Sequence, residues 1–171
     1  LRLTPRRAMS IAQELYEGLQ VGGGESVGLI TYMRTDSVQV ATSAVSEARG
    51  YITETYGKDY VPGKPRVFTT KAKSAQEAHE AIRPTSIRRT PDSVKAFLSR
   101  PQLNLYSLVW SRMLASQMAD ARTEATTVDI EATCQSSNQV YVFRATGSVL
   151  IFPGFRTLYL ESRDDEEEDR G

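Results

Sequence analysis

The sequence predicts an α+β fold, in which a mainly helical part is followed by an antiparallel β segment. Two observations support this prediction. Up to about residue 121, apolar residues recur at the spacing of amphipathic helices, and capping residues, prolines and glycines separate the segments. Beyond that point the helical spacing is lost, and β-branched and aromatic residues partly alternate with polar ones. We therefore expect a boundary near residues 121–123.

Five helices and one short strand are expected before the boundary. The first helix opens at Thr4-Pro5, because threonine caps a helix and proline fits its first turn. A glycine run at residues 22–24 ends it, and the apolar run at 27–32 predicts a buried or half-buried strand. Asp36 and Ser37 are good caps for the second helix. Three further helices are expected at about residues 75–82, 91–98 and 102–118, and Thr90-Pro91 caps the second of these.

The segment after the boundary predicts an antiparallel meander. Strands are expected at residues 126–133, 140–146 and 157–160, with turns at 136–138 and 153–154. The last stretch, 161–171, contains seven acidic residues and no apolar side chain, which is typical of disorder. The expected division is a helical domain at 1–121, a β segment of an adjoining domain at 122–160, and an acidic loop or tail at 161–171.

The composition excludes several classes of protein. The 171 residues are 40% hydrophobic and 25% charged, and no apolar stretch approaches the roughly 20 residues that span a bilayer. Cys134 is the only cysteine, which excludes an internal disulfide, and with a single histidine a Cys/His zinc site cannot be assembled. An intracellular setting fits this usage. Because the first residue is leucine, we expect a piece of a longer protein.

The charge is divided unequally along the chain. Residues 1–122 hold 17 Lys/Arg against 11 Asp/Glu, a net charge of +6. Residues 123–171 hold 4 against 10, a net charge of −6. The first part is therefore the candidate for binding a polyanion. Such a charge is common over this length, so charge alone favours nucleic-acid binding only slightly.

Residues 28–37 combine groups that can bind and attack a phosphodiester. If the strand continues, its period of two places Tyr32 and Arg34 on the same side. A guanidinium and a helix N-terminus can hold a phosphate and stabilise the charge of its transition state. A phenol, with an ordinary pKa of about 10, leaves more readily than an alkoxide, so a phosphotyrosine bond is reversible. The alternative is that Tyr32 is a core residue and Arg34 an ordinary surface residue. The chemistry of these residues alone favours this alternative.

Residues 71–85 form the second candidate stretch. Gln76, His79, Glu80 and Arg83 have mutual spacings of three and four, which would place them on one face of a short helix. Histidine can change its protonation state near neutral pH, so His79 could carry a proton or hold a phosphate. The alternative is a solvated surface histidine flanked by glutamates, and it is favoured when this stretch is considered alone.

Together, the two stretches resemble the motifs of type IA DNA topoisomerases. Gly-Leu-Ile-Thr-Tyr-Met-Arg-Thr-Asp-Ser at 28–37 resembles the active-site signature of that family. Ala-Gln-Glu-Ala-His-Glu-Ala-Ile-Arg-Pro-Thr at 75–85 resembles its second motif, at the correct distance. Residues 12–17 and 105–118 resemble two of its helices, so the resemblance extends to about residue 160. The methionine between Tyr32 and Arg34, Met33, resembles the motif of bacterial topoisomerase I. The topoisomerase III branch commonly has proline at this position.

The resemblance implies a reaction. Tyr32 would attack single-stranded DNA and become linked to a 5′ phosphate, another strand would pass, and the freed 3′ hydroxyl would reseal the break without ATP, relaxing negative supercoils. Arg34 would hold the scissile phosphate, and His79 would assist binding or proton transfer, so these three residues are the expected catalytic set. The residues expected to bind DNA are Arg34, His79, Arg83, Lys71 and Lys73. The residues expected to organise the site are Asp36, Ser37 and Glu80, and Arg83 would also contribute to that organisation.

The resemblance also implies partners and a cofactor. The family binds Mg²⁺ through an Asp-x-Asp motif in a separate Toprim domain, and this sequence has no Asp-x-Asp, so we expect no metal on this chain and no activity from it alone. Its tyrosine domain would be winged-helix-like and lead into a β-rich arch. We expect a bacterial, monomeric, cytoplasmic and nucleoid-associated protein that binds single-stranded DNA, but neither a nucleotide nor a membrane. The main alternative is a non-catalytic winged-helix DNA-binding module, and a third, a protein-binding adaptor, has no feature in its favour.

Overall fold

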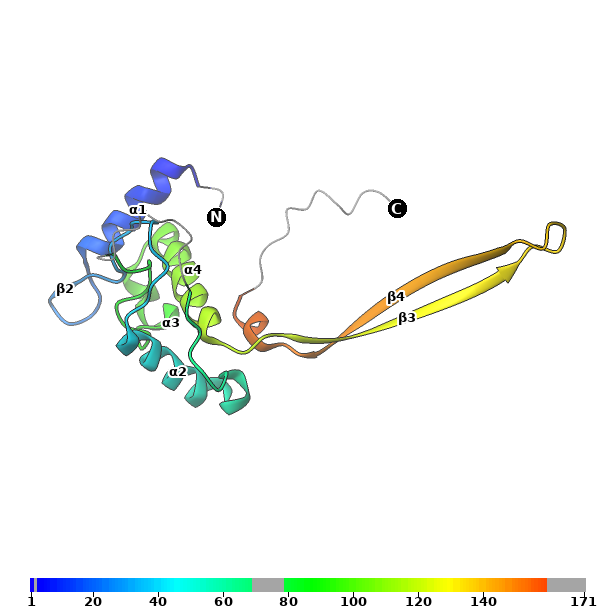
Figure 1. The fold of residues 1–171 in the computed structure, drawn as a ribbon. Coiled ribbons are helices and arrows are strands. Elements are labelled where there is room, and N and C mark those ends of the chain that lie inside the picture. The colour runs from blue at the N-terminus through cyan, green and yellow to red at the C-terminus, as the bar shows by residue number, and fades with distance from the viewer. Residues whose placement is uncertain (2, 69–78, 160–171) are drawn as a thin grey trace.

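The computed structural model describes residues 1, 3–68 and 79–159. Its α+β class confirms the prediction, and within the described residues there are four α-helices and two antiparallel two-stranded sheets. Figure 1 shows the helices gathered in one body, from which a long hairpin projects. No helix among the described residues is long and apolar enough to cross a bilayer. The elements are α1 (Pro5–Glu17), β1 (Leu19–Gln20), β2 (Ser26–Val27), α2 (Thr42–Tyr56), η1 (Lys58–Tyr60), α3 (Pro91–Val94), η2 (Lys95–Phe97), α4 (Arg100–Gln117), β3 (Arg122–Thr133), β4 (Val140–Phe152) and η3 (Gly154–Thr157).

Local capping explains where three of the helices begin. The side chain of Thr4 accepts a hydrogen bond from the backbone of Arg7, with Pro5 in the first turn of α1. Thr90 caps α3 in the same way. At the start of α4, the backbone N–H of Ser99 donates to Oε1 of Gln102 over 2.8 Å. These contacts satisfy N–H groups that have no partner inside the helix. The caps at Thr4 and Thr90 lie where the sequence predicts them, whereas α4 begins slightly before its predicted start.

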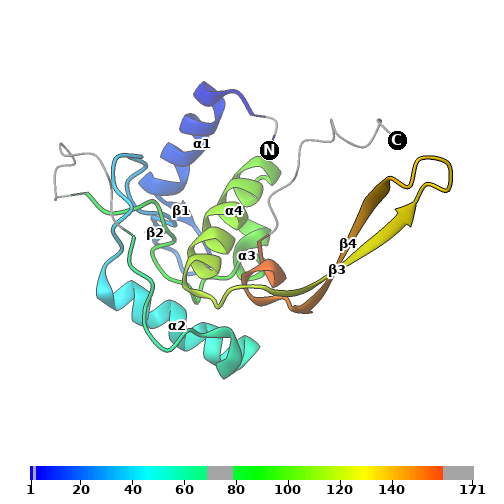
Figure 2. The ribbon, with the colours of Figure 1, turned by 45° about the vertical axis from the view of Figure 1, so that its right-hand side comes forward.

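One apolar core joins the helices to the loop segments between them. Figure 2 shows α1, α2 and α4 surrounding this centre. Buried aromatic residues of α4 also bind the loop before α3: Tyr106 donates to the carbonyl oxygen of Arg89 over 2.6 Å, and Trp110 donates to that of Ile87 over 2.9 Å. Burial raises the pKa of Tyr106 to about 12. The core includes Ile11, Leu15, Leu29, Ile30, Ala48, Ile52, Ile87, Tyr106, Trp110 and Leu114.

The hairpin of β3 and β4 is attached to the helical body at its base. The rings of Tyr60 and Phe152 lie 4.8 Å apart, and the backbone N–H of Phe155 donates to the carbonyl oxygen of Ala119 over 2.9 Å. Gly154 has a φ of 50°, and a side chain there would collide with the carbonyl of Ala119. Apart from its base, the hairpin is exposed on both faces.

Two predictions about the β regions are wrong. The chain after β4 turns into η3 instead of forming a strand at 157–160, because Gly154 adopts a left-handed conformation against Ala119; residue 160 lies outside the described residues. The expected meander is therefore a hairpin in the described part. The strand expected at 27–32 is shorter, since β2 ends at Val27 and only Ile30 forms a further bridge, to Pro84.

Two predicted helices also differ. The second helix begins at Thr42, not beside Asp36 and Ser37, because the Ser37 hydroxyl accepts from the backbone of Gln39 in a local turn. The third expected helix, at 75–82, is not formed by residues 79–82, and its remainder lies outside the described residues. The division at 1–121, 122–160 and 161–171 stays a prediction, as does the disorder of the last stretch, which is likewise not described.

Candidate active site

The two sequence motifs lie against each other as paired extended segments. The backbone N–H of Thr31 donates to the carbonyl oxygen of Arg83 over 2.9 Å, and that of Thr85 donates to Leu29 over 3.0 Å. These bonds surround the antiparallel bridge between Ile30 and Pro84. Segments that are about fifty residues apart in the sequence are thereby placed side by side.

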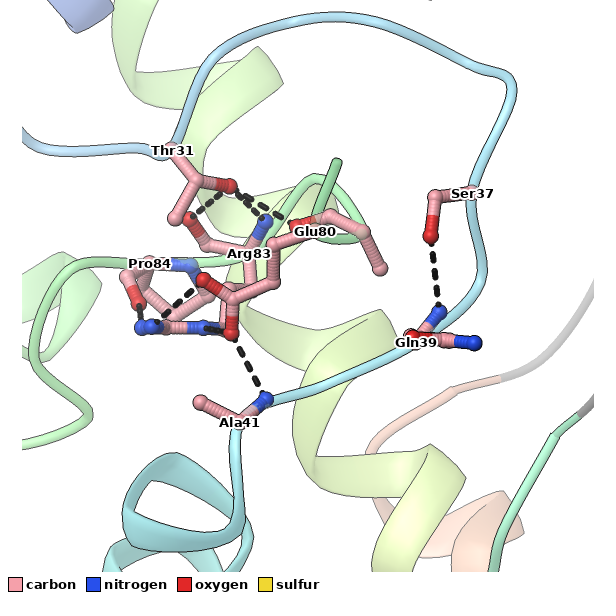
Figure 3. A network of polar contacts seen from close by, with 8 residues as sticks. Thr31, Ser37, Gln39, Ala41, Glu80, Arg83 and Pro84 are labelled. Atoms are coloured by element: carbon pink, nitrogen blue, oxygen red, sulfur yellow. Dashed lines mark hydrogen bonds and ion pairs between the residues drawn. The ribbon is translucent and has the colours of Figure 1, made fainter. Parts of the chain in front are cut away.

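Threonine hydroxyls add to this pairing. Oγ1 of Thr31 donates to the carbonyl oxygen of Ala81 over 2.8 Å and accepts from the backbone N–H of Arg83 over 3.0 Å. Oγ1 of Thr85 donates to the carbonyl oxygen of Gly28 over 2.7 Å. Figure 3 shows Thr31 facing the segment that contains Glu80, Arg83 and Pro84. The residue directly before Tyr32 is therefore fixed to the second motif.

Tyr32 directly follows this paired segment and is exposed to solvent. Its side chain is 50% exposed, so the alternative of a core tyrosine does not describe it. Its ring contacts Tyr16 edge to face, with centroids 5.2 Å apart and planes at 65°. Both rings line a surface pocket of about 540 Å³, and the other lining residues are Gly28, Ile30, Thr31, Arg34, His79, Glu80 and Thr85. A phenol at the edge of such a pocket is accessible to a bound substrate.

Arg34, Asp36 and His79 form a polar cluster in this region. Nη1 of Arg34 lies 3.1 Å from Nε2 of His79. Because a guanidinium has only donors, Nε2 must be the acceptor, which assigns the ring proton to Nδ1. The buried Nδ1 lies 3.2 Å from Oδ2 of Asp36, without the alignment of a hydrogen bond, and the same oxygen is 3.7 Å from Nε of Arg34. The half-exposed Arg34 therefore brings a permanent positive charge to the pocket that contains Tyr32.

Glu80, which lines the pocket, forms a partly buried pair with Arg83. Nε and Nη2 of Arg83 donate to the two carboxylate oxygens of Glu80 over 2.7 and 3.0 Å, and Nη1 donates to the carbonyl oxygen of Pro84. Oε1 of Glu80 also accepts from the backbone of Ala41, at the start of α2 (Figure 3). Burial raises the pKa of Glu80, but the hydrogen bonds from Arg83 and Ala41 outweigh it and leave that pKa below its ordinary value. The pair ties the second motif to α2, where a negative charge also suits the helix dipole.

The loss of stability caused by replacing Glu80 should depend on pH. Because the pKa of Glu80 is lowered in the folded state, its stabilising effect is present above the ordinary value of 4.5 and is lost as the pH falls through the lower folded pKa. We expect Glu80→Gln to lower the urea midpoint near neutral pH, with the difference from wild type shrinking below pH 4.5. The matched control is Glu54→Gln, since Glu54 pairs with Arg88 but both are more than half exposed. A difference from wild type that does not change with pH would contradict the assignment.

The remaining predicted residues are placed as follows. Ser37 bonds only locally among the described contacts, and the helix N-terminus expected beside the phosphate is absent because α2 starts at Thr42. Lys71 and Lys73 lie outside the described residues. Arg83 has a side chain that is 14% exposed and bonded to Glu80, and its binding to DNA stays a prediction.

Sequence reasoning did not single out Tyr16, Thr31 or Thr85. Thr31 and Thr85 lie inside or beside the two motifs, so the only signal was a hydroxyl-bearing residue in an extended run. Tyr16 was visible only as part of a helix resembling the family's. In each case the partner is distant in sequence, and local spacing cannot reveal it.

The described residues do not fit a metal site. Within residues 1, 3–68 and 79–159 there is no group of three or more His, Cys, Asp and Glu side chains that could hold a metal ion. Asp36, the carboxylate of the polar cluster, is already between Arg34 and His79.

A larger pocket does not compete as the active site. It has a volume of about 690 Å³ and lies against α4 and η3, with a lining that includes Met113, Met118, Phe155 and Tyr159. Its lining contains none of the three candidate catalytic residues. The smaller pocket is the candidate because it brings a phenol, a guanidinium and an imidazole together.

Comparisons with known proteins assign the chain to the DNA topoisomerase family. The family model described as DNA topoisomerase matches residues 1–170, and the chain belongs to that family. DNA topoisomerase 1 of Xylella fastidiosa (strain Temecula1 / ATCC 700964) is 49% identical over 174 residues, covering 100% of this chain and 21% of that protein. DNA topoisomerase 1 of Rickettsia prowazekii (strain Madrid E) is 45% identical over 169 residues, covering 99% and 21%.

A solved structure agrees with this assignment. Full-length topoisomerase I from Thermotoga maritima matches with a TM-score of 0.75 and 34% identity, covering 100% of this chain and 26% of that chain. The resemblance to bacterial topoisomerase I found in the sequence is thereby confirmed. The chain spans about a fifth of the length of the curated relatives named above.

Proposed function

We propose that this chain supplies the nucleophile of a type IA DNA topoisomerase, and that Tyr32 is the attacking residue. The observation that supports the proposal is the half-exposed phenol of Tyr32 in one pocket with Arg34, whose guanidinium is held by His79 and Asp36. Membership of the DNA topoisomerase family supports the same assignment. The parent protein would transiently cleave single-stranded DNA, pass a strand and relax negative supercoils.

The proposed chemistry is a reversible transfer of a phosphoryl group. Oη of Tyr32 attacks the phosphorus of a DNA phosphodiester and loses its proton, while the bond to the 3′ oxygen breaks and that oxygen gains a proton. The product is a 5′-phosphotyrosine link and a free 3′ hydroxyl. Resealing is the reverse reaction, so no ATP is needed. The phenolate is a good leaving group, which keeps both directions accessible.

The polar cluster would act on the phosphate. Arg34 neutralises charge that develops on the non-bridging oxygens in the transition state. His79 assists phosphate binding and, through Nε2, keeps the guanidinium of Arg34 oriented toward the pocket. Asp36 holds both side chains, and the Glu80–Arg83 pair fixes the second motif behind them. Lys71, Lys73 and Arg83 are proposed to contact DNA outside the scissile phosphate.

Further properties belong to the same proposal. Mg²⁺ would be bound by another domain of the parent protein, because this sequence has no Asp-x-Asp motif. The helical part would be winged-helix-like, and the hairpin would belong to the adjoining arch domain. The parent protein would act as a monomer in the cytoplasm, at the nucleoid.

The experiment that tests the proposal traps the covalent intermediate. Full-length protein is mixed with end-labelled single-stranded DNA, denatured, and separated by electrophoresis. We expect a labelled adduct when the label lies on the fragment 3′ of the break, because that fragment has the 5′ phosphate. An adduct only with the opposite fragment, or none at all, would contradict the proposal.

The 171-residue chain alone should not relax supercoiled DNA, even with Mg²⁺ present. The reason is that Mg²⁺ is expected on an Asp-x-Asp motif in another domain of the parent protein, and this sequence has no Asp-x-Asp. Agarose electrophoresis of a negatively supercoiled plasmid measures the result, with full-length protein as the positive control. Relaxation by the purified chain would show that the residues needed for the whole reaction are contained in it.

A further inference from the structure

Tyr16 is the aromatic neighbour of the proposed nucleophile. Its ring meets that of Tyr32 edge to face, 5.2 Å between centroids, and both rings line the same pocket. From this contact we infer that Tyr16 is a positioning residue, which orients the phenol of Tyr32 for attack without itself touching the reacting atoms. The inference rests on the proposed function of Tyr32.

The backbone of Tyr16 is fixed relative to the strand that leads to Tyr32. The backbone N–H of Leu29 donates to the carbonyl oxygen of Leu15 over 2.7 Å, directly beside Tyr16. Gly28 packs so closely that a Cβ there would lie 2.7 Å from the carbonyl oxygen of Tyr16. The end of α1 is thus held against the approach to Tyr32, so the two contacting rings project from backbone segments that are fixed relative to each other.

Tyr32 needs such a surface because the rest of its surroundings are open. Tyr32 is half exposed, and its backbone forms a tight turn in which the N–H of Arg34 donates to the carbonyl oxygen of Tyr32. That bond constrains the main chain and leaves rotation about the side-chain bonds. A nucleophile has to reach its target at roughly 3–3.5 Å with the correct orientation. An edge-to-face contact restricts the ring to the orientations that preserve it.

Because Tyr16 is partly exposed, a role in positioning Tyr32 can be distinguished from a role in packing the core. Tyr16 is 40% exposed, whereas its neighbours in α1 that face the core, Ile11 and Leu15, are fully buried. Removing the ring of Tyr16 therefore leaves the core filled. Met9 is also exposed on α1, at 51%, and its replacement provides a matched control on the same helix.

The test uses full-length protein and single-turnover cleavage of labelled single-stranded DNA. Tyr16→Phe keeps the ring, whereas Tyr16→Leu and Tyr16→Met remove it. We expect Phe to cleave within about twofold of wild type, and the ring-less variants to cleave roughly 2- to 12-fold more slowly, the range that corresponds to one aromatic pair. The Kd for single-stranded DNA should be unchanged, and Met9→Ala should match wild type. The rate is compared for whichever ring-less variant keeps the wild-type melting temperature.

The outcomes separate this inference from the proposed function. Wild-type cleavage rates in a folded ring-less variant would overturn the role of Tyr16 and leave that of Tyr32 intact. A loss of DNA affinity equal to the loss of rate would overturn it too, since Tyr16 would then bind DNA. A Phe variant as slow as Leu would assign the effect to the hydroxyl and also overturn it. If wild-type protein formed no adduct, the proposed function would fail, and this inference with it.

Discussion

Tyr32→Phe in the full-length protein should abolish the covalent adduct with DNA and leave the fold intact. The change removes one oxygen from a half-exposed ring and keeps the edge-to-face contact with Tyr16. Stability should therefore change by less than about 0.5 kcal/mol, as is usual for exposed positions. Covalent catalysis has no substitute route once the attacking oxygen is gone, so cleavage should fall below detection. Denaturing electrophoresis of end-labelled single-stranded DNA measures the adduct, and thermal melting checks the fold.

The control for this substitution is another exposed tyrosine. Tyr141 lies on β4, is 49% exposed, and its hydroxyl donates to Gln139. Tyr141→Phe removes the same atom from the same type of side chain, and adduct formation should equal that of wild type. Persistence of the adduct in correctly folded Tyr32→Phe would refute the assignment of the nucleophile. Another residue of the full-length protein would then have to attack the DNA.

Sequence reasoning predicted helix starts well where the partner of a capping group is local. Thr4 and Thr90 each accept from a backbone N–H three residues ahead, a contact that depends only on neighbouring residues. The same reasoning was wrong for Asp36 and Ser37. The hydroxyl of Ser37 accepts a hydrogen bond from the backbone N–H of Gln39. At the observed start of α2, the backbone N–H of Ala41 donates instead to Glu80, which lies 39 residues further along the chain. No local pattern contains that partner.

The candidate site shows the same limit. Spacing alone placed His79, Glu80 and Arg83 on one face of a helix, yet residues 79–82 are not helical. They meet the first motif because Thr31 pairs with Arg83 through backbone and side chain. The resemblance grouped the two motifs correctly, since family motifs record such long-range contacts. The reason for their proximity, an antiparallel pairing, becomes visible only in three dimensions.

Arg34→Ala should slow cleavage by roughly 10²- to 10³-fold, the cost of removing one preorganised donor from a developing negative charge. The side chain of Arg34 is 53% exposed, so the loss should leave the melting temperature nearly unchanged. The change also removes the partner of Nε2 of His79 and one of the cations beside Asp36. The rate constant for adduct formation, measured in single turnover at saturating DNA, isolates this effect from binding.

Arg34→Lys tests whether charge alone is sufficient. Lysine keeps the positive charge, but an ammonium cannot donate to His79 and to two phosphate oxygens with the planar geometry of a guanidinium. We expect a rate between those of Arg34→Ala and wild type. Arg88→Ala is the matched control, because Arg88 pairs with Glu54 on the surface and is 58% exposed, so its loss should not alter cleavage. Equal rates for Arg34→Ala and wild type would exclude Arg34 from the transition state. The pocket would then hold the nucleophile without its charge-stabilising group, and that group would have to come from another domain of the parent protein.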